Sequence, residues 1–223
     1  MDQFRIRQFD IIPNNILDVP ITVVGAGAIG SATVISLAKV GFRKITVYDF
    51  DVVSDENMSN QFYAISQIGN SKVTALQKMT QSLAGISIQP MNMKYDFPLT
   101  PNSIVICAVD CMTVRKEIFE HHRDTICRFF IDTRMGAEEL QIHALSLTDK
   151  KRANSYAKSL YSNDDSVEVA CTSKATMYTP LLCAGLVTKI VKDFMLELPY
   201  TKSISWNINQ NSMVSFLSTK DKK

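Results

Sequence analysis

Hydrophobic and polar positions predict a strand, a turn, a helix and a second strand in residues 21–51. An apolar run leads into a glycine-rich turn at 25–30, a helix-like stretch follows, and a second apolar run ends at Asp49 and Asp51. Glycines let the backbone approach a phosphate, the N-terminus of the following helix stabilises its charge, and a carboxylate about 20 residues further on is where ribose hydroxyls bind. The pattern therefore predicts a nucleotide-binding βαβ unit, without deciding which nucleotide. The turn residues expected at the nucleotide are Gly25, Gly27, Ala28, Ile29 and Gly30.

The rest of the chain continues this alternation and then departs from it. The run 103–108 is apolar throughout, as in a parallel strand buried on both faces, and strict strand-helix alternation stops after residue 147. We expect a single α/β domain over residues 1–223, with a Rossmann-like, mostly parallel sheet, helices on both faces and antiparallel strands towards the C-terminus. An N-terminal arm is expected at 1–19 and a polar crossover loop at 161–178. The other expected strands lie at 86–93, 127–132, 140–147, 203–209 and 213–217, and the later helices at 71–83, 112–122, 149–160 and 179–198.

The composition is that of an ordinary globular protein. With 223 residues, 46% of them hydrophobic, the chain can bury a sizeable core. The net charge is +2 and basic residues are interspersed with acidic ones, so nothing supports nucleic acid as a partner. The first residues lack an apolar leader and no apolar run approaches about 18 residues, so we expect a cytoplasmic protein without a membrane span. Five cysteines without a CxxC pair indicate neither a disulfide framework nor a structural zinc.

Two charged residues outside the glycine turn favour Mg-ATP over NAD. Asp110 follows the apolar run 103–108, where a carboxylate beside a pyrophosphate would be repelled unless a divalent metal lay between them. Lys72 stands in the first turn of an expected helix, where the helix dipole does not favour a cation, so it could neutralise phosphate charge. Two simpler interpretations stay open, namely Asp110 as the cap of helix 112–122 and Lys72 as a solvated surface lysine.

Several motifs together resemble the adenylyltransferases of the ThiF/MoeB and ubiquitin-activating superfamily. They are the glycine turn, the polar stretch 48–61, G-N-S-K at 69–72 and A-V-D at 108–110. The resemblance implies a homodimeric enzyme that uses ATP and Mg²⁺ to adenylate the C-terminal glycine carboxylate of a small ubiquitin-like or sulfur-carrier protein, or of a peptide. It also implies roles for individual residues: ribose binding by Asp49, phosphate binding by Asn57 and Lys72, further nucleotide contacts by Asp51 and Gln61, and magnesium binding by Asp110.

The chain departs from the family pattern at Asn60, where many members have arginine. Positive charge near a transferring phosphoryl group lowers the barrier, so this replacement puts the rate, and the activity itself, in question. Two arginines are expected to compensate. Arg7 lies in an R-I-R-Q segment resembling one with which family dimers reach into the neighbouring site, and Arg134 lies in I-D-T-R-M-G. The alternatives are a surface role for Arg7 and a loop-ordering role for Arg134.

Cys171 lies in V-A-C-T-S-K, which looks like the segment of those family members whose catalytic cysteine accepts the acyl group as a thioester. A position near Lys174 at a helix N-terminus would favour the thiolate. The alternative is an inert loop thiol, because members that only adenylate use the same loop to cover the nucleotide. Three other functions stay open: a catalytically weak or inactive scaffold subunit, an NAD(P)-binding oxidoreductase, and a relative that adenylates and dehydrates a modified tRNA base.

Overall fold

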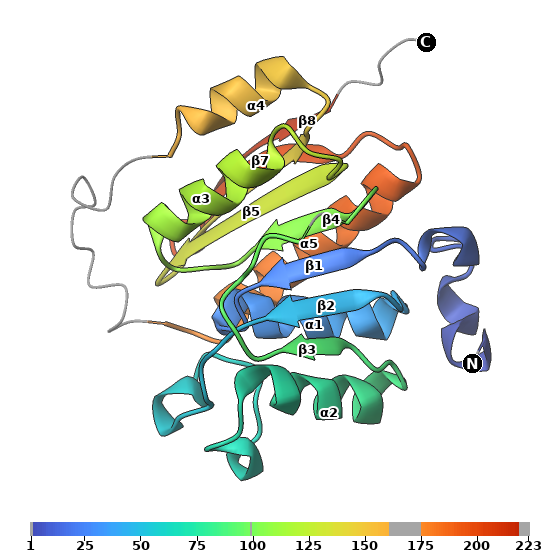
Figure 1. The fold of residues 1–223 in the computed structure, drawn as a ribbon, viewed down its shortest axis with the longest axis vertical. Coiled ribbons are helices and arrows are strands. Elements are labelled where there is room, and N and C mark those ends of the chain that lie inside the picture. Colours follow the sequence, from blue (N-terminus) through green and yellow to red (C-terminus); the bar gives the residue numbers. More distant parts are fainter. Residues whose placement is uncertain (1, 99, 161–174, 219–223) are drawn as a thin grey trace.

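The chain forms one mixed sheet with helices on both faces (Figure 1). The computed structural model describes residues 2–98, 100–160 and 175–218. The strands are β1 (Ile21–Val24), β2 (Ile45–Tyr48), β3 (Gln89–Met91), β4 (Ile104–Cys107), β5 (Phe129–Gly136), β6 (Glu139–Ser146), β7 (Thr201–Asn207) and β8 (Ser212–Leu217). The α-helices are α1 (Ala28–Val40), α2 (Lys72–Ala84), α3 (Met112–His122), α4 (Lys150–Ala157) and α5 (Tyr178–Met195), and short 3-10 helices lie at Asp2–Gln8, Asn14–Ile16, Asp55–Asn57 and Ile65–Gln67.

The strand order is β3-β2-β1-β4-β5-β6-β7-β8. Strands β3, β2, β1, β4 and β5 pair in parallel, whereas β5 to β8 pair antiparallel. The chain passes from β1 to β2 on one side and later to β4 on the other, so the order reverses beside β1. Such a reversal leaves a crevice at the carboxyl ends of the strands, where open α/β sheets bind ligands. The predicted fold class is confirmed.

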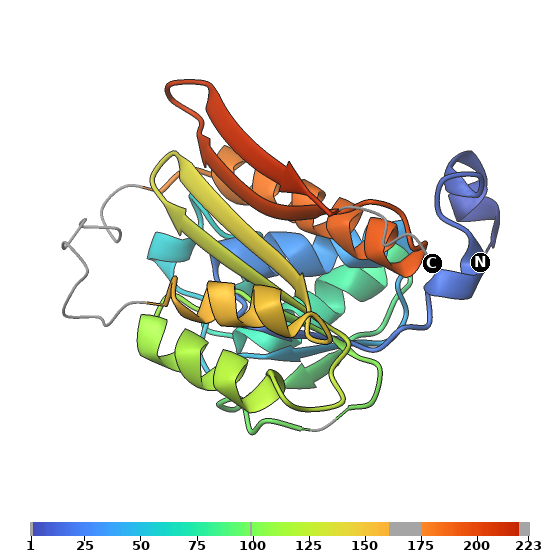
Figure 2. The same ribbon diagram turned by 90° about the horizontal axis from the view of Figure 1, so that it is seen from above.

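Two hydrophobic cores lie on opposite faces of the sheet. On one face α1, α2 and α5 pack against the strands, and on the other face α3 and α4 do so (Figures 1 and 2). Successive residues of a strand point to opposite faces, and in β1 Val23 belongs to the first core whereas Val24 belongs to the second. The second core includes the aromatic side chains Phe119 and Tyr156, which pack edge to face with their ring centroids 4.7 Å apart. Both faces of the central strands are therefore buried.

Three expected boundaries differ from the structure. Residues 133–136, predicted as a loop after the fifth strand, instead extend β5, because they pair with the first half of β6. Strand β3 has three residues instead of eight, since it is the edge strand and contains Pro90, which cannot donate a hydrogen bond to a neighbour. Tyr178, placed in the crossover loop, is the first residue of α5, and residues 161–174 of that loop lie outside the described residues.

The N-terminal arm packs against the C-terminal end of α1. Arg5 donates from Nε to the Val40 carbonyl at 3.0 Å and from Nη2 to the Ile12 carbonyl at 2.8 Å, and Gln8 donates to the Val40 carbonyl at 3.2 Å. In Figure 1 the arm lies at the right, whereas the arrows of β1 and β2 point to the left. The arm therefore lies at the opposite edge of the sheet from the glycine turn.

Two further expectations from the composition can be compared with the structure. None of the helices in the described part of the chain is long and apolar enough to cross a membrane. Among the described cysteines, Cys107, Cys127 and Cys183 are buried and form no disulfide with one another.

The buried imidazole of His122 makes stability depend on pH. Its Nε2 lies 2.7 Å from the Tyr95 hydroxyl, and burial, together with the charge of His121, lowers its pKa to about 4. An unfolded histidine has a pKa near 6.5, so between about pH 6.5 and 4 the unfolded state takes up a proton that the folded state does not. Stability therefore falls as the pH drops through this window.

We expect that His122→Gln lessens this acid sensitivity. Urea denaturation at pH 7 and pH 5 should show a loss of stability about 2 kcal/mol smaller in the variant than in the unmodified chain. The neighbouring, exposed His121 provides the matched control, and His121→Gln should still lose most of the stability that the unmodified chain loses, because the burial of His122 is kept. Equal losses in all three proteins would contradict the assignment.

Candidate functional site

The predicted nucleotide-binding residues gather at the carboxyl edge of the three central parallel strands. Val24, at the end of β1, pairs in register with Tyr48 of β2 on one side and with Cys107 of β4 on the other. The glycine turn after β1 therefore lies between Asp49, which follows β2, and Asp110, which follows β4. Neighbouring strands are about 4.8 Å apart, so the three segments form one continuous rim.

The glycine turn is tightly packed on one side and open on the other. Gly25 has φ +95°, and a Cβ there would lie 2.6 Å from the Ala108 carbonyl oxygen. A Cβ on Gly30 would lie 1.9 Å from the Gly25 oxygen, so this glycine permits the close approach of α1 to the turn. A Cβ on Gly27 would meet none of the described residues within 4 Å. Gly27 thus borders open space at the N-terminus of α1, whose first-turn N–H groups have no intrahelical acceptor. A phosphate group fits this space.

Substitution of the two glycines should separate binding from folding. In Gly30→Ala the new methyl group collides with backbone, and we expect a loss of stability of about 1–3 kcal/mol or more. In Gly27→Ala the methyl group enters the open space, so thermal unfolding should be unchanged while affinity for Mg-ATP falls about tenfold, or 1.4 kcal/mol. Differential scanning fluorimetry and isothermal titration calorimetry measure the two effects. Unchanged ATP affinity in Gly27→Ala would contradict the placement of the phosphates.

The Asp49 carboxylate fastens the turn to the end of β2. One oxygen accepts a hydrogen bond from the Ala26 N–H at 2.6 Å, and the other accepts from the Asp51 N–H at 2.8 Å. Behind the turn, the Tyr63 hydroxyl donates to the Ala26 carbonyl at 2.6 Å. Burial and the charges of Asp49 and Asp51 raise the pKa of Tyr63, so it remains a donor. Sequence reasoning missed Tyr63, because nothing local indicates which carbonyl it contacts.

The loop after β2 turns back over α1 and brings three amides to the rim. Asn57 is buried, and its side-chain oxygen accepts from the Ser54 N–H at 3.0 Å, which closes the short helix Asp55–Asn57. The Phe62 N–H donates to the Ser31 hydroxyl at 2.9 Å. The side-chain oxygens of Asn60 and Gln61 are buried without a hydrogen-bond partner among the described residues. Buried polar atoms are normally paired, so these two amide oxygens are exceptions among the described residues. Either oxygen can accept a hydrogen bond from a donor such as a hydroxyl group.

Lys72 is buried and paired with Asp51. Its side chain is 8% exposed, and its ammonium group lies 2.9 Å from the Asp51 carboxylate, which is half exposed. The interpretation as a solvated surface lysine is therefore wrong. The pairing explains how a cation is tolerated in the first turn of α2, because the Asp51 charge offsets both burial and the helix dipole.

Asp110 is exposed, and its carboxylate makes no hydrogen bond with any described residue. The N-cap position of α3 is held by Cys111, so the capping interpretation of Asp110 is wrong. No cluster of three or more histidine, cysteine or acidic side chains exists within the described ranges, so Asp110 would supply one ligand. Magnesium fits this donor set, because it commonly takes one or two carboxylates together with phosphate oxygens and water.

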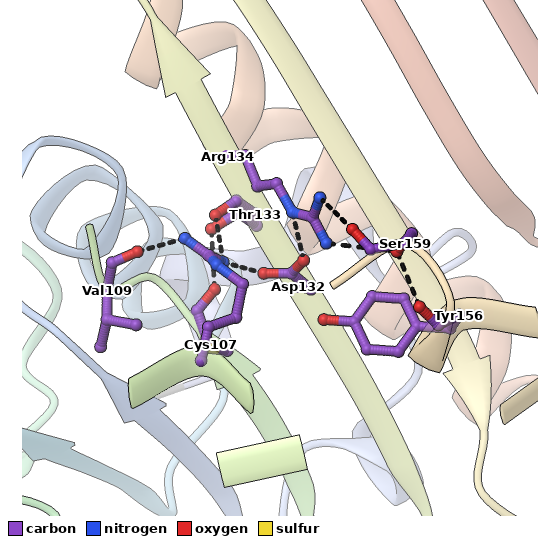
Figure 3. Close-up of polar contacts among 8 residues, drawn as sticks. Cys107, Val109, Asp132, Thr133, Arg134, Tyr156 and Ser159 are labelled. Carbon is purple, nitrogen blue, oxygen red and sulfur yellow. Dashed lines mark hydrogen bonds and ion pairs between the residues drawn. The ribbon is translucent and has the colours of Figure 1, made fainter. Parts of the chain in front are cut away.

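A buried network lies beside the Asp110 segment (Figure 3). Asp132, with no exposed surface, forms ion pairs with Arg115 and, at 2.8 Å, with Arg134. Arg134 also donates to the carbonyl and the hydroxyl of Ser159, at 3.3 and 3.4 Å. The guanidinium of Arg134 is therefore already engaged in ordering the chain after α4. Arg115 and Asp132 were not recognised in the sequence, since Arg115 lies outside the motifs and nothing local in I-D-T-R-M-G indicates that Asp132 is buried and paired.

Two predicted residues are not brought to this rim by the described chain. Arg7 is exposed on the N-terminal arm, at the far end of α1, a helix about 20 Å long. It can reach a nucleotide site only in a second copy of the chain. Cys171 lies outside the described residues.

The part of the chain that carries the rim residues matches a known protein family. The sequence model of the ThiF family matches residues 13–128, which include the glycine turn, Lys72 and Asp110. Ubiquitin-like modifier-activating enzyme 5 of Dictyostelium discoideum is 32% identical over 80 residues, covering 35% of this chain and 21% of that protein. Molybdopterin-synthase adenylyltransferase of Salmonella typhimurium is 30% identical over 124 residues, covering 52% of this chain and 50% of that protein. The chain thus spans no more than half of either relative.

One solved structure extends the likeness to the fold. The crystal structure of E. coli MccB with AMPCPP and MccA superposes with a TM-score of 0.69 at 14% identity, covering 93% of this chain and 66% of that chain. At this identity the likeness concerns the fold alone.

Proposed function

The chain belongs to the ThiF family, and from this membership we propose that it is an ATP- and Mg²⁺-dependent adenylyltransferase. Its substrate is the C-terminal glycine carboxylate of a small ubiquitin-like or sulfur-carrier protein, or of a peptide. The observation that carries the proposal is the rim itself, where the open space at Gly27 lies between the Lys72–Asp51 pair and the exposed carboxylate of Asp110, to which no described residue donates a hydrogen bond. The named relatives activate a ubiquitin-like modifier or adenylate molybdopterin synthase, which supports this substrate class.

Each rim residue has a role in binding the nucleotide. The N–H groups of Ala28, Ile29 and Gly30 receive the phosphates at the N-terminus of α1. Asp49 and the amides of Asn57 and Gln61 hold the ribose and phosphate oxygens, and Lys72 turns from Asp51 towards the phosphates. Asp110 holds Mg²⁺, which when bound neutralises charge on the phosphate oxygens.

The reaction requires positioning more than covalent participation of the protein. A carboxylate oxygen of the carrier attacks the α-phosphorus in line, an O–P bond forms, and the bond to the bridging oxygen breaks as pyrophosphate leaves. Lys72 stabilises the charge that develops on the leaving phosphates. Asn60 offers a neutral amide where many family members have arginine, so a further cation must come from elsewhere. Arg7 of a second copy in a homodimer, or Arg134 if released from Ser159, would supply it.

Cys171 is proposed to accept the activated acyl group. Its thiolate attacks the acyl carbon, a thioester forms and AMP leaves. Mass spectrometry of the chain incubated with ATP and carrier should then find a thiol-sensitive adduct on Cys171. Adenylate without an adduct would restrict the activity to adenylation. An adduct on another residue would contradict the role of Cys171.

ATP–pyrophosphate exchange tests the proposal directly. Exchange should require a purified ubiquitin-like or sulfur-carrier protein ending in glycine, and should disappear when that glycine is removed. Asn60 favours a second candidate, a scaffold subunit of the same fold with weak or no catalysis. Mg-ATP binding without exchange, for any carrier tested, would favour the scaffold, and absence of Mg-ATP binding would contradict the proposed enzyme.

A further inference from the structure

None of the described residues holds the Asp110 side chain in place by a hydrogen bond. The carboxylate is exposed, makes no hydrogen bond with any described residue, and belongs to a segment between β4 and α3 without regular secondary structure. The backbone then sets the Cα–Cβ direction from which the rotamers of the carboxylate start. The question for metal binding is therefore what fixes the peptide groups on either side of Asp110.

Arg115 donates hydrogen bonds to the carbonyl groups of the residues before and after Asp110, through its side chain to Val109 and through the ordinary helical backbone bond to Cys111. The guanidinium Nη2 donates to the Val109 carbonyl on one side, and the backbone N–H donates to the Cys111 carbonyl at 3.0 Å on the other. Upstream, the Ala108 N–H donates to the Val24 carbonyl of β1 at 2.8 Å. A single helical residue therefore fastens the Asp110 segment to α3, while β1 fastens its beginning to the glycine turn.

The guanidinium is itself held from the opposite side. Its Nη1 forms the ion pair with the fully buried Asp132 and donates to the Thr133 carbonyl at 2.9 Å, and the Thr133 hydroxyl donates to the Cys107 carbonyl at 3.0 Å. These contacts gather where the end of β4 pairs with the middle of β5, and Figure 3 shows Cys107, Asp132 and Thr133 close together there. Arg115 is 3% exposed, so its orientation is determined by protein groups and not by solvent.

A buried ion pair is a costly way to gain stability, because apolar side chains of similar volume often stabilise a core equally well or better. What the guanidinium supplies, and an apolar side chain cannot, is a fork that holds two backbone carbonyls and a carboxylate in fixed directions. The geometry points to a role in preorganisation of the neighbouring site.

We propose that Arg115 is a positioning residue that fixes Asp110 for divalent metal binding, and that Asp132 holds Arg115 in the required orientation. This inference rests on the proposed function, since it concerns the metal of the adenylation site. It assigns Arg115 no contact with the metal or the nucleotide.

Metal binding measured by electron paramagnetic resonance tests the inference without reference to turnover. Mn²⁺ is titrated into the full chain in the presence of α,β-methylene-ATP. In Arg115→Lys the charge facing Asp132 remains, but one ammonium group cannot replace the two-sided fork, so we expect Mn²⁺ affinity to fall about tenfold. Affinity for the analogue without divalent metal should stay within about twofold, because the phosphate-binding turn is unchanged.

Arg152 provides a matched control. It lies on α4 and donates through Nη2 to the Lys202 carbonyl at 2.9 Å, far along the chain from Asp110. Arg152→Lys removes a guanidinium–carbonyl contact of the same kind, yet should leave Mn²⁺ affinity unchanged. In an Asp110→Asn background, Arg115→Lys should have no further effect on Mn²⁺ binding, because its influence passes through that carboxylate.

The outcomes separate this inference from the proposed function. Absence of Mn²⁺ binding by the unmodified chain contradicts both. Binding by the unmodified chain with equal affinity in Arg115→Lys contradicts the inference alone, as does an equal loss in Arg152→Lys. If Arg115→Lys does not fold, Arg115→Gln replaces it, since Asp132 keeps its ion pair with Arg134, and the same loss of Mn²⁺ affinity is expected.

Discussion

Asp110→Asn is expected to lower the rate of ATP–pyrophosphate exchange by about 100- to 1000-fold, the effect typical of losing one preorganised charge-stabilising group. The substitution keeps the size of the side chain and removes the negative charge that would hold Mg²⁺ against the phosphates. Because the carboxylate contacts no described residue, the fold loses no interaction. The melting temperature should therefore stay unchanged while exchange is lost.

Asp55→Asn is the matched control for this variant. Asp55 is an exposed acid in the loop after β2, at the same edge of the sheet, and the structure gives it no part in the site. Exchange by Asp55→Asn should match that of the unmodified chain. Exchange by Asp110→Asn within about threefold of the control would exclude the metal role, since loss of a ligand charge costs far more.

Lys72→Met should reduce exchange by about 100-fold, because it removes the cation proposed to stabilise charge on the phosphates. The stem of Lys72 is buried, and methionine has a similar volume, so the packing of α2 against the sheet is kept. The Asp51 carboxylate, which then lacks its ion-pair partner, is half exposed and can be solvated by water. Urea denaturation should show a loss of stability below about 1 kcal/mol, because this variant leaves no buried charge without a partner.

Substitution of Asp51, the other member of this ion pair, should reduce stability more than Lys72→Met does. Asp51→Asn leaves the Lys72 ammonium group buried without a counter-charge, and breaking a buried pair in this way costs about 3–5 kcal/mol where burial is complete. We therefore expect Asp51→Asn to be destabilised more than Lys72→Met in the same denaturation experiment. Equal stability of the two variants would show that the ammonium group is solvated in the folded chain.

Much of the site was accessible from the sequence because its parts are local. The turn at 25–30 needs glycine for reasons that lie within a few residues, and Asp49 follows at the spacing of one strand and one helix. Asp110 could be placed at the same edge because carboxyl ends of parallel strands meet there. Membership in the ThiF family, inferred from these motifs, is confirmed by the match over residues 13–128.

Other features depend on partners distant in the chain. The extension of β5 through Arg134 arises from pairing with β6, and no local pattern distinguishes it from a loop. The burial of Lys72 follows from the position of Asp51, 21 residues earlier. Arg7 looked like a residue of the site in the motif, yet the arm attaches it to the opposite edge of the sheet.

The sequence by itself therefore determined the βαβ unit, the succession of strands and helices along the chain and the acids that follow the strands, since hydrophobic period, glycine and strand ends are properties of short segments. Only the tertiary structure decided which charged groups are paired. Arg115 and Asp132 are 17 residues apart, and their ion pair exists because α3 packs where the end of β4 pairs with the middle of β5. Burial and electrostatic pairing depend on all neighbours in space, so they cannot be read from neighbours in sequence.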